Sequence, residues 1–420
     1  MGNVSILVGA QWGDEGKGKW IDILARDVDI VARFQGGNNA GHTLYVDGQK
    51  VVLHQIPSGI FHANKISALC AGVVVNPSQL LAEIRKVAAF VQLTPERLWL
   101  SARAHVISPW HIYLDSKTET EAAKPIGTTK RGIGPTYAEK ANRTGIRLGD
   151  YIHADRRQAW YESLSETNPR FAEHRKAHVD QWQEFDKAAD ELRPFVNDAE
   201  HLVRREIQNG KKALLEGAQG ALLDINHGTY PYVTSSETAA GGAFASLGFS
   251  PKSVDKIYGV AKAYVTRVGS GAFPTELTDD VGKHLATAGK EFGATTGRPR
   301  RCGWLDAVAL RYSGAISGYD GLILNKMDIL TGLDEIKVCV AYDHPVHGRI
   351  EEFPWDHEIL AACKPIYKSF KGWTEALPNG GKISELSKNA RVYVDGVEEI
   401  LGFPVSMVGT GVNRQDALFR

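Results

Sequence analysis

The chain has 420 residues, of which 43% are hydrophobic and 23% charged, and its formal net charge is zero. This balance is close to that of an average folded enzyme, and it excludes a protein that bulk positive charge holds to nucleic acid or to an anionic membrane. No apolar run approaches the roughly 20 residues that span a bilayer, the N-terminus shows no secretory signal, and the four cysteines form no close metal-ligand pair. We therefore expect a cytoplasmic protein.

The predicted elements at the start of the chain alternate between strand and helix. Residues 4–8 favour a buried strand, a glycine-rich turn follows, residues 20–26 favour a helix, and residues 29–34 favour the next strand. This order is typical of a mostly parallel sheet. The apolar spacing of residues 78–92 predicts another helix. Further strands are predicted over residues 212–216, 257–264 and 321–325.

Two segments differ in character from these elements. Residues 155–210 are charged, poor in glycine and helical in pattern, so we predict a helical subdomain over about residues 150–210. The candidates for its buried face are Trp160, Leu164, Trp182 and Phe185. Residues 336–400 favour a strand-rich periphery. Because no internal repeat or linker is evident, a single domain over residues 1–420 is expected.

The first motif with chemical meaning is Gly13-Asp-Glu-Gly-Lys-Gly-Lys, between the first predicted strand and the first predicted helix. Glycines let backbone N–H groups converge on a phosphate, and a helix N-terminus adds positive potential. The Ser or Thr that holds Mg²⁺ in phosphate loops is replaced by Trp20, so Asp14 or Glu15 would have to take the metal. Taken alone, the motif also fits a glycine-rich turn with solvated charges.

A second motif, Asn325-Lys326-Met327-Asp328, directly follows the apolar run Gly321-Leu-Ile-Leu. Many GTPases bind guanine with such a motif, because the Asp carboxylate accepts hydrogen bonds from N1–H and the 2-amino group while the Lys stem covers the base. Adenine lacks both donors, and a buried carboxylate left unpaired costs roughly 1–3 kcal/mol. The alternative is a Lys–Asp pair on the surface. Together with the phosphate loop, the motif favours GTP over ATP.

A histidine follows the second predicted strand, in the sequence Gly41-His42-Thr43. The carboxyl ends of parallel strands line the ligand crevice of an open sheet. His42 is therefore placed for general acid chemistry. A lone histidine is more often structural, so this role depends on its context.

Three further segments combine glycine with polar residues. Residues 293–304 carry three arginines within four positions of a Gly/Thr loop, which favours an anion site over a solvated basic turn because guanidinium groups bind carboxylate and phosphate with two hydrogen bonds. Residues 126–137 and 216–224 are polar, glycine-rich and unlike ordinary linkers. We predict that both are ligand loops.

Strings of this kind occur in order along nearly the whole chain. They are Gln11-Trp-Gly-Asp-Glu-Gly-Lys-Gly-Lys, Gly36-Gly-Asn-Asn-Ala-Gly-His-Thr, His54-Gln-Ile-Pro-Ser-Gly, Gly127-Thr-Thr-Lys-Arg-Gly-Ile-Gly-Pro, Glu216-Gly-Ala-Gln-Gly, His227-Gly-Thr-Tyr-Pro-Tyr-Val-Thr-Ser-Ser, Arg267-Val-Gly-Ser-Gly-Ala-Phe-Pro-Thr-Glu and Gly293-Ala-Thr-Thr-Gly-Arg. Together they closely resemble the adenylosuccinate synthetase family. Long strings in family order are far more specific than any single motif.

The resemblance implies a ligase that joins IMP and L-aspartate into adenylosuccinate and hydrolyses GTP to GDP and phosphate, with Mg²⁺. Asp14 matches the base that takes the N1 proton of IMP so that O6 attacks the γ-phosphate, and His42 matches the acid that helps the bridging oxygen leave. The aspartate amine then displaces the 6-phosphoryl group. Asp14 and the carbonyl group of Gly41 match the metal ligands, which accounts for Trp20.

The resemblance also implies binding residues for each substrate. Those for GTP are Gly13, Asp14, Glu15, Gly16, Lys17, Gly18, Lys19, Gly41, His42, Thr43, Arg300, Lys326, Met327, Asp328, Gly409, Thr410 and Gly411. Those for IMP are Asp14, Glu15, Gly16, Lys17, Asn39, Ala40, Gly41, His42, Thr129, Arg143, Gln219, Thr234 and Arg298. Those for aspartate are Ala294, Thr295, Thr296, Gly297, Arg298, Pro299 and Arg300. The position of Arg143 implies a homodimer, because its counterpart reaches IMP in the neighbouring subunit.

Other hypotheses compete with the ligase. A regulatory GTP switch would use the same phosphate loop and Asn-Lys-x-Asp motif but would not need Arg298, Arg300 or His42. A nucleic-acid-binding protein would use the basic loops, which the neutral overall charge disfavours, and we expect neither a nucleic-acid nor a membrane partner. Related enzymes that accept a deoxyguanine nucleotide lack the loop carboxylate, so Asp14 argues against that branch. The expected fold is α/β, with a large, mostly parallel central sheet flanked by helices, a P-loop-like GTP site, and helical and small strand-rich insertions.

Overall fold

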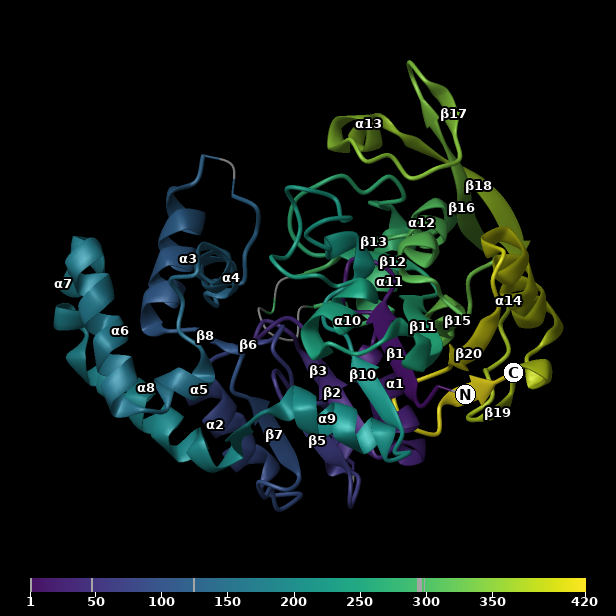
Figure 1. Ribbon diagram of the computed structural model, residues 1–420. Helices are drawn as coiled ribbons and strands as arrows, with labels where there is room; N and C mark the ends of the chain where they lie inside the picture. Colours follow the sequence, from purple (N-terminus) through teal and green to yellow (C-terminus); the bar gives the residue numbers. More distant parts are fainter. Residues whose placement is uncertain (1, 47, 124, 293–296, 298) are drawn as a thin grey trace.

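The computed structural model describes residues 2–46, 48–123, 125–292, 297 and 299–420. Within these residues, the centre of the molecule is an eleven-stranded sheet (Figure 1). In spatial order its strands are β19 (Gly381–Lys382), β21 (Ala417–Phe419), β20 (Val405–Gly409), β15 (Gly321–Asn325), β11 (Val254–Lys262), β1 (Val4–Gly9), β10 (Ala213–Glu216), β2 (Ile30–Arg33), β5 (Ile66–Leu69), β7 (Leu98–Ser101) and β9 (Val196–Asn197).

Neighbouring strands of this sheet are mostly parallel. β1 lies near the middle and pairs in parallel with β10 on one side and β11 on the other. Parallel pairing continues from β20 to β9, whereas β20 and β21 are antiparallel. The prediction of an α/β fold with a large, mostly parallel central sheet is therefore confirmed. The carboxyl ends of β1, β10, β11 and β15 meet at one edge of the sheet, where ligands bind in such folds.

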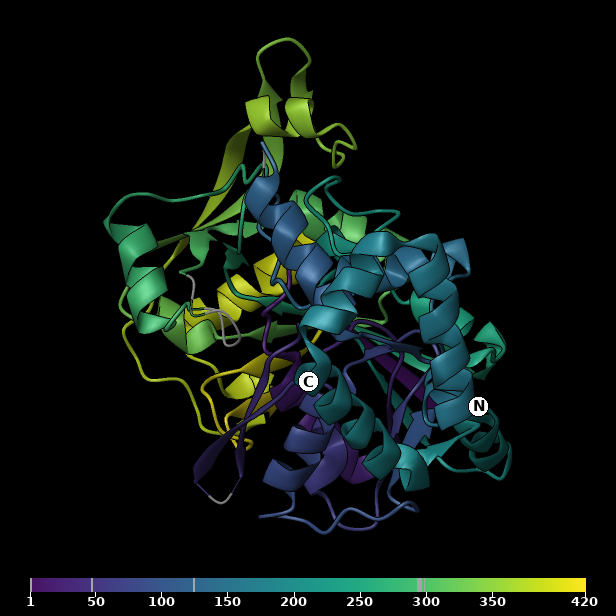
Figure 2. The same cartoon turned by 90° about the vertical axis from the view of Figure 1, so that its left-hand side faces the viewer.

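Helices flank the sheet and extend beyond it. They are α1 (Lys17–Leu24), α2 (Pro77–Val87), α3 (Pro109–Glu121), α4 (Ile133–Asn142), α5 (Leu148–Tyr151), α6 (Ala154–Thr167), α7 (Pro169–Ala177), α8 (Val179–Leu192), α9 (Ala199–Gln208), α10 (Gly241–Leu247), α11 (Asp280–Ala288), α12 (Ala307–Ser317), α13 (His357–Ala362) and α14 (Lys388–Leu401). The side of the molecule that carries α6, α7 and α8 faces the viewer in Figure 2. Within the described ranges, no helix is long and apolar enough to cross a membrane.

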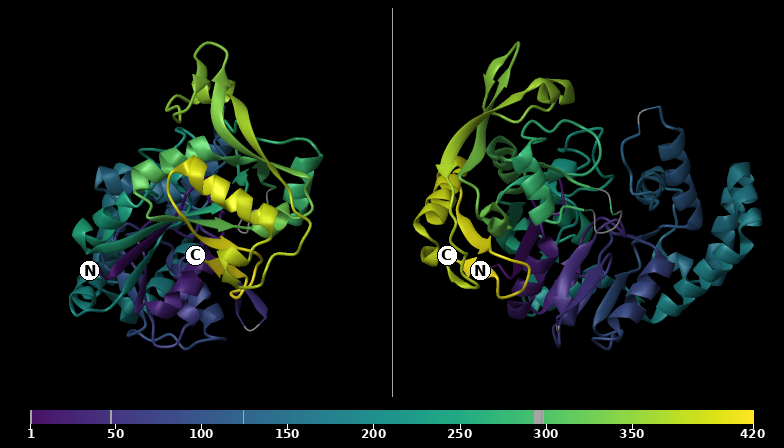
Figure 3. Two further views of the ribbon diagram at one scale, coloured as in Figure 1. Left: turned by 90° about the vertical axis from the view of Figure 1, so that its right-hand side faces the viewer. Right: turned by 180° about the vertical axis from the view of Figure 1, so that it is seen from behind.

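Small sheets complete the architecture. They pair β3 (His42–Val46) with β4 (Gln49–Leu53), β6 (Val74–Val75) with β8 (His105–Val106), β12 (Val265–Arg267) with β13 (Arg301–Gly303), and β16 (Glu335–His344) with β14 (Leu305–Asp306), β17 (Gly348–Ile350) and β18 (Lys364–Lys371). The sheet around β16 projects from the molecule on the side that carries α14 (Figure 3, left). These pieces agree with the small strand-rich insertions expected from the sequence.

Most predicted elements are present with shifted ends. The helix after the phosphate loop begins at Lys17, earlier than predicted, and the helix predicted over residues 78–92 ends at Val87. The strand-rich interpretation of residues 336–400 is wrong for its last part, which forms α14. The buried side chains of α14 recur at helical spacing, which brings them onto one face. They are Ala390, Tyr393, Val394, Val397 and Leu401.

The segment with charged helical character forms the helices α5 to α9. Its predicted buried-face residues differ in burial, since Trp182 and Phe185 are buried whereas Trp160 and Leu164 are half-buried. The segment is interrupted before α9 by β9, which pairs with β7 at the edge of the central sheet. Whether these helices form a subdomain of a single domain stays a prediction.

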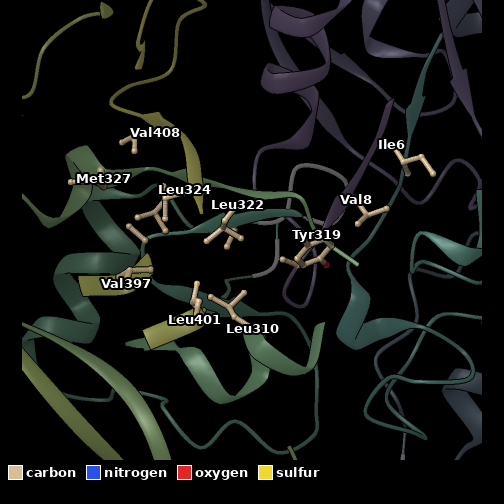
Figure 4. Packing of buried hydrophobic residues seen from close by; sticks show 14 of the residues in the cluster. Ile6, Val8, Leu310, Tyr319, Leu322, Leu324, Met327, Val397, Leu401 and Val408 are labelled. Carbon is tan, nitrogen blue, oxygen red and sulfur yellow. The ribbon is translucent and has the colours of Figure 1, made fainter. Parts of the chain in front are cut away.

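The main hydrophobic core joins the sheet to the helices behind it. Figure 4 shows Leu322 and Leu324 of β15 on one side of this packing, with Leu310 of α12 and Val397 of α14 on the other. Each of these side chains is almost completely removed from solvent, and burying an aliphatic side chain contributes about 1.5–3 kcal/mol. This packing fixes β15, and so it fixes the position of the Asn-Lys-Met-Asp motif that follows from Asn325.

Candidate active site

The phosphate loop between β1 and α1 is held by a buried carboxylate of its own. Glu15 is completely buried, and its Oε1 accepts hydrogen bonds from the backbone N–H groups of Gln11 (3.1 Å) and Gly13 (2.8 Å). Its Oε2 lies 2.6 Å from Nζ of Lys17. Gly16, with φ of 91°, then starts α1. The carboxylate of Glu15 therefore shapes the loop from inside, and the loop turns through left-handed conformations that favour glycine.

Replacing Gly16 with alanine is expected to weaken the fold and to distort the phosphate loop. Alanine at φ 91° is strained, and its Cβ would lie 2.2 Å from Nδ2 of Asn325. We expect a loss of about 1–3 kcal/mol in the free energy of unfolding, measured by denaturant titration. Gly210→Ala is the matched control, because Gly210 has φ of 89° and no atom within 4 Å of the added Cβ. An equal loss of stability in the two variants would show that the contact between residue 16 and Asn325 does not constrain the loop.

The Asn-Lys-Met-Asp motif contacts the phosphate loop directly. Nδ2 of Asn325 donates a hydrogen bond to the carbonyl oxygen of Glu15 at 2.8 Å. Asp328 follows in a short 3-10 helix (Met327–Leu330), and burial raises the pKa of its carboxyl group. Its Oδ1 is buried and has no hydrogen-bond partner among the described residues. A buried acceptor without a partner is unusual in a folded protein, so this atom is suited to a ligand that donates hydrogen bonds.

A lysine of α1 connects the phosphate loop to the C-terminal glycine segment. Nζ of Lys19 donates hydrogen bonds to the carbonyl oxygens of Gly411 (2.8 Å) and Asp416 (2.7 Å). Burial lowers the pKa of Lys19 to about 8, although Asp416 and Asp328 oppose the change. The predicted base-binding segments, residues 326–328 and 409–411, are thereby brought to the same helix N-terminus.

His42 stands at the start of β3 with its ring held by a buried carboxylate. Nδ1 lies 2.5 Å from Oε1 of Glu216 and 3.1 Å from Oγ of Ser58. Glu216 also accepts hydrogen bonds from the backbone N–H and the hydroxyl of Ser58, both at 2.8 Å. Burial lowers the pKa of His42, and the negative charge of Glu216 opposes this effect. Because Glu216 fixes Nδ1, the other ring nitrogen is the one available to a ligand. His42 also lies beside Gly18, since a Cβ on Gly18 would be 2.8 Å from Cβ of His42.

Asp14 lies on the phosphate loop in a left-handed conformation, with φ of 60°. Its Oδ2 accepts a hydrogen bond from Nε of Arg300 at 2.8 Å. The side chain of Asp14 keeps 32% of its surface exposed, whereas that of Arg300 keeps 9%. The arginine predicted to hold a substrate carboxylate therefore holds the predicted base in this structure.

Comparison with known proteins gives the family of the chain. The sequence model of the family described as adenylosuccinate synthetase matches residues 6–418. The chain belongs to the adenylosuccinate synthetase family. The synthetases of Desulforudis audaxviator and Myxococcus xanthus are each 47% identical to it, over 98% of this chain and 97% of theirs. The family predicted from the sequence is confirmed.

Solved structures match the fold as well. A structure titled fully ligated adenylosuccinate synthetase from Plasmodium falciparum has a TM-score of 0.94 and 41% identity, and both chains are covered completely. A cyanophage S-2L succinoaminodeoxyadenylate synthetase has a TM-score of 0.64 at 17% identity, covering 100% of this chain and 95% of that one. The second likeness concerns the fold alone.

Not every residue expected in a synthetase site is brought to the phosphate loop by a direct contact. Gln219 does contact the loop, because its carbonyl oxygen accepts a hydrogen bond from Nζ of Lys17. Its side-chain Oε1 is buried and has no partner among the described residues. Arg143 is exposed at the end of α4 with φ of 63°, and Thr129 lies half-buried between α3 and α4. Thr234 belongs to the segment after β10, where its N–H donates to the carbonyl of Leu223 at 2.8 Å.

The remaining predicted residues lie on neighbouring loops or outside the described residues. Asn39 accepts a hydrogen bond from the N–H of Gly37 at 3.2 Å, next to buried Ala40. Gly41 and Thr43 flank His42 and are half-buried. Of the predicted aspartate loop, Gly297, Pro299 and Arg300 are described. Those outside the described residues are Ala294, Thr295, Thr296 and Arg298.

Several site residues were missed by reasoning from the sequence. Glu216 was part of a predicted ligand loop, but no role was assigned to its side chain. A charged residue at the end of an apolar strand could have indicated a buried functional carboxylate. Asn325 was named only as the first letter of its motif. Lys262, at the end of β11, and Glu291, just before the arginine-rich loop, carried no local signal. Both belong to a buried ionic cluster that tertiary structure alone reveals.

Proposed function

We propose that this chain ligates IMP and L-aspartate into adenylosuccinate while GTP is converted to GDP and phosphate. The observation that carries the proposal is the Asn325–Glu15 hydrogen bond. This bond brings the Asn-Lys-Met-Asp motif next to the phosphate loop that contains Asp14. In the motif, Oδ1 of Asp328 has no hydrogen-bond partner among the described residues. A guanine base and its phosphates would fill these two places together. Membership of the synthetase family supports the same substrates.

The reaction proceeds in two steps that use Asp14 and His42. Asp14 takes the N1 proton of IMP, O6 forms a bond to the γ-phosphorus, and the bond from this phosphorus to the bridging oxygen breaks. His42 donates a proton to that oxygen as GDP leaves. The amine of aspartate then attacks C6, and phosphate departs with O6. Position and charge stabilisation, which the buried loops provide, are the main contributions of a protein to phosphoryl transfer.

The donor set around Asp14 fits Mg²⁺, a hard cation that takes oxygen ligands. The partly exposed carboxylate of Asp14 and the carbonyl oxygen of Gly41 would hold it. This suits Mg²⁺, which is commonly bound through one or two carboxylates together with substrate phosphates and water. When bound, Mg²⁺ would neutralise phosphate charge. Arg300 would have to share or release Oδ2 of Asp14 in that state.

The other assignments follow the synthetase pattern as proposals. Gln219, with its partnerless Oε1, and Asn39 would contact IMP, while Arg298 and Arg300 would hold the carboxylates of aspartate. Arg143 would reach the IMP site of a neighbouring subunit in a homodimer, which agrees with its exposure at the end of α4.

One assay tests the proposed function. Purified chain is incubated with GTP, Mg²⁺, IMP and aspartate, and adenylosuccinate and phosphate are both quantified, with each substrate left out in turn. The proposal predicts equal amounts of the two products, and neither product when any substrate is missing. GTP hydrolysis that proceeds equally well without IMP and aspartate would instead support a GTP switch and overturn the ligase.

Replacing Glu216 with glutamine is expected to lower kcat about 10–100-fold while each KM stays within about 2-fold. The carboxylate orients His42 and opposes the lowering of its pKa by burial. Without it, the imidazole is misplaced and loses its proton more easily. Ser58→Ala is the control, because it removes the hydroxyl contacts to Glu216 and to His42 but keeps the carboxylate charge beside the imidazole. Equal kcat values for Glu216→Gln and Ser58→Ala, measured under saturating substrates, would remove Glu216 from this role.

A further inference from the structure

Glu291 lies at the base of the arginine-rich loop and has no role in the mechanism above. Its backbone carbonyl accepts a hydrogen bond from the N–H of Arg300 at 2.9 Å, and a β-bridge joins Phe292 to Pro299. Pro299 and Arg300 belong to the segment that is expected to bind aspartate. Glu291 therefore holds the described end of that segment through its main chain.

The side chain of Glu291 points away from solvent, with 1% of the residue exposed, into a cluster of donors. Oε1 accepts hydrogen bonds from the hydroxyl of Tyr264 and from Nζ of Lys326, the latter at 2.6 Å. Oε2 accepts hydrogen bonds from Nζ of Lys262 at 2.9 Å and from a guanidinium nitrogen of Arg300 at 2.7 Å. Each oxygen thus binds one deeply buried partner and one partner of the proposed active site.

The two buried partners hold the carboxylate of Glu291 in place. Tyr264 and Lys262 are fully buried, and the ammonium group of Lys262 is also 2.5 Å from Oγ1 of Thr266. The two site partners are less enclosed, since the side chain of Lys326 keeps 25% of its surface exposed. Charge-assisted hydrogen bonds of this kind hold long side chains in one geometry. A single carboxylate thereby fixes the lysine of the base-binding motif and the arginine that bonds Asp14.

We propose that Glu291 is a positioning residue that couples GTP binding to aspartate binding, by holding Lys326 against the guanine base and Arg300 at the aspartate loop. The proposal rests on the proposed function, because it assigns the two substrates to those two side chains. Lys262, Lys326 and Arg300 carry charges of the same sign, and all three contact the carboxylate of Glu291, which offsets their mutual repulsion. Without that carboxylate the three cations repel one another, and the two that can reach solvent move.

The test replaces Glu291 with glutamine, which keeps the size of the side chain and removes its charge. We expect the KM values for GTP and for aspartate each to rise about 10-fold or more, because hydrogen bonds to a charged group are lost on both site cations. The KM for IMP should stay within about 2-fold. Glu200→Gln is the matched control, since Glu200 is a buried carboxylate of α9 that accepts hydrogen bonds from Ala71 and Arg103 and lies outside the proposed site. It should leave all three KM values unchanged.

A double-mutant cycle separates positioning from a general loss of structure. In a Lys326→Met background, Glu291→Gln should no longer raise the KM for GTP further, yet it should still raise the KM for aspartate. A uniform fall in kcat with all KM values unchanged, or additive effects on the KM for GTP, would overturn the proposal.

If Glu291→Gln does not fold, Glu291→Asp keeps the charge but is one methylene shorter, and unchanged KM values in that variant would also overturn it. Failure of the ligase itself is recognised separately, because the unmodified chain would then make no adenylosuccinate.

Discussion

Replacing Asp14 with asparagine is expected to lower kcat about 10³-fold while the chain stays folded. Asparagine cannot take the N1 proton of IMP, and general base catalysis contributes about 10²–10⁴-fold. It is also a weaker ligand for Mg²⁺ than a carboxylate. The fold should persist because the side chain of Asp14 is partly exposed and bonds only Arg300 among the described residues. Steady-state formation of adenylosuccinate, together with circular dichroism and thermal unfolding, measures both effects.

The control for this variant is Asp29→Asn. Asp29 undergoes the same chemical change, but it stands before β2, at the opposite edge of the sheet, where it accepts a hydrogen bond from the N–H of Lys212. Its kcat should match that of the unmodified chain. Substantial activity in Asp14→Asn, within about 10-fold of the unmodified chain, would remove Asp14 from the base role.

Replacing Asp328 with asparagine is expected to change the nucleotide that the chain uses. Guanine presents two donors, N1–H and the 2-amino group, which a carboxylate accepts and an amide NH₂ group opposes. A site built around such hydrogen bonds rejects a mismatched ligand strongly, so kcat/KM for GTP should fall about 10²-fold or more. Xanthine carries an oxygen in place of the 2-amino group, and XTP should therefore become the better substrate. The measurement is kcat/KM for GTP and XTP with the same IMP and aspartate.

The neighbouring Asp334 provides the matched control for Asp328. Its side chain is exposed, and the contact it makes with Gly372 runs through its backbone carbonyl oxygen. Asp334→Asn should keep the preference for GTP. An Asp328→Asn variant with the same preference for GTP over XTP would show that the carboxylate does not bind the guanine base. The contact between Asn325 and the phosphate loop would then need another explanation.

Motifs that are contiguous in the sequence could be predicted well. The phosphate loop is bounded by a strand and a helix, so glycines at that place indicated a turn, and the structure has this turn with positive φ at Gly13 and Gly16. The parallel sheet followed from the alternation of strands and helices. The motif from Asn325 to Asp328 was placed at the end of a strand, and the structure has it there.

Contacts between distant segments could not be predicted in the same way. The partners of Glu291 come from β11, from the loop after β15 and from the arginine-rich loop, and no local pattern connects them. Arg300 was expected on a substrate carboxylate, but in the structure its guanidinium group bonds two protein carboxylates, those of Asp14 and Glu291. The helix α14 was missed although its apolar residues follow the helical period, since its β-branched valines also favoured a strand.

Phosphorylation of O6 before its displacement by the amine is tested most directly by following the O6 atom of IMP. IMP labelled with oxygen-18 at O6 is converted with GTP, Mg²⁺ and aspartate, and the phosphate product is analysed by mass spectrometry. We expect the label to appear in phosphate, because O6 becomes bonded to the γ-phosphorus and the amine displaces it from C6. Unlabelled phosphate, formed together with adenylosuccinate while the label passes to water, would contradict it.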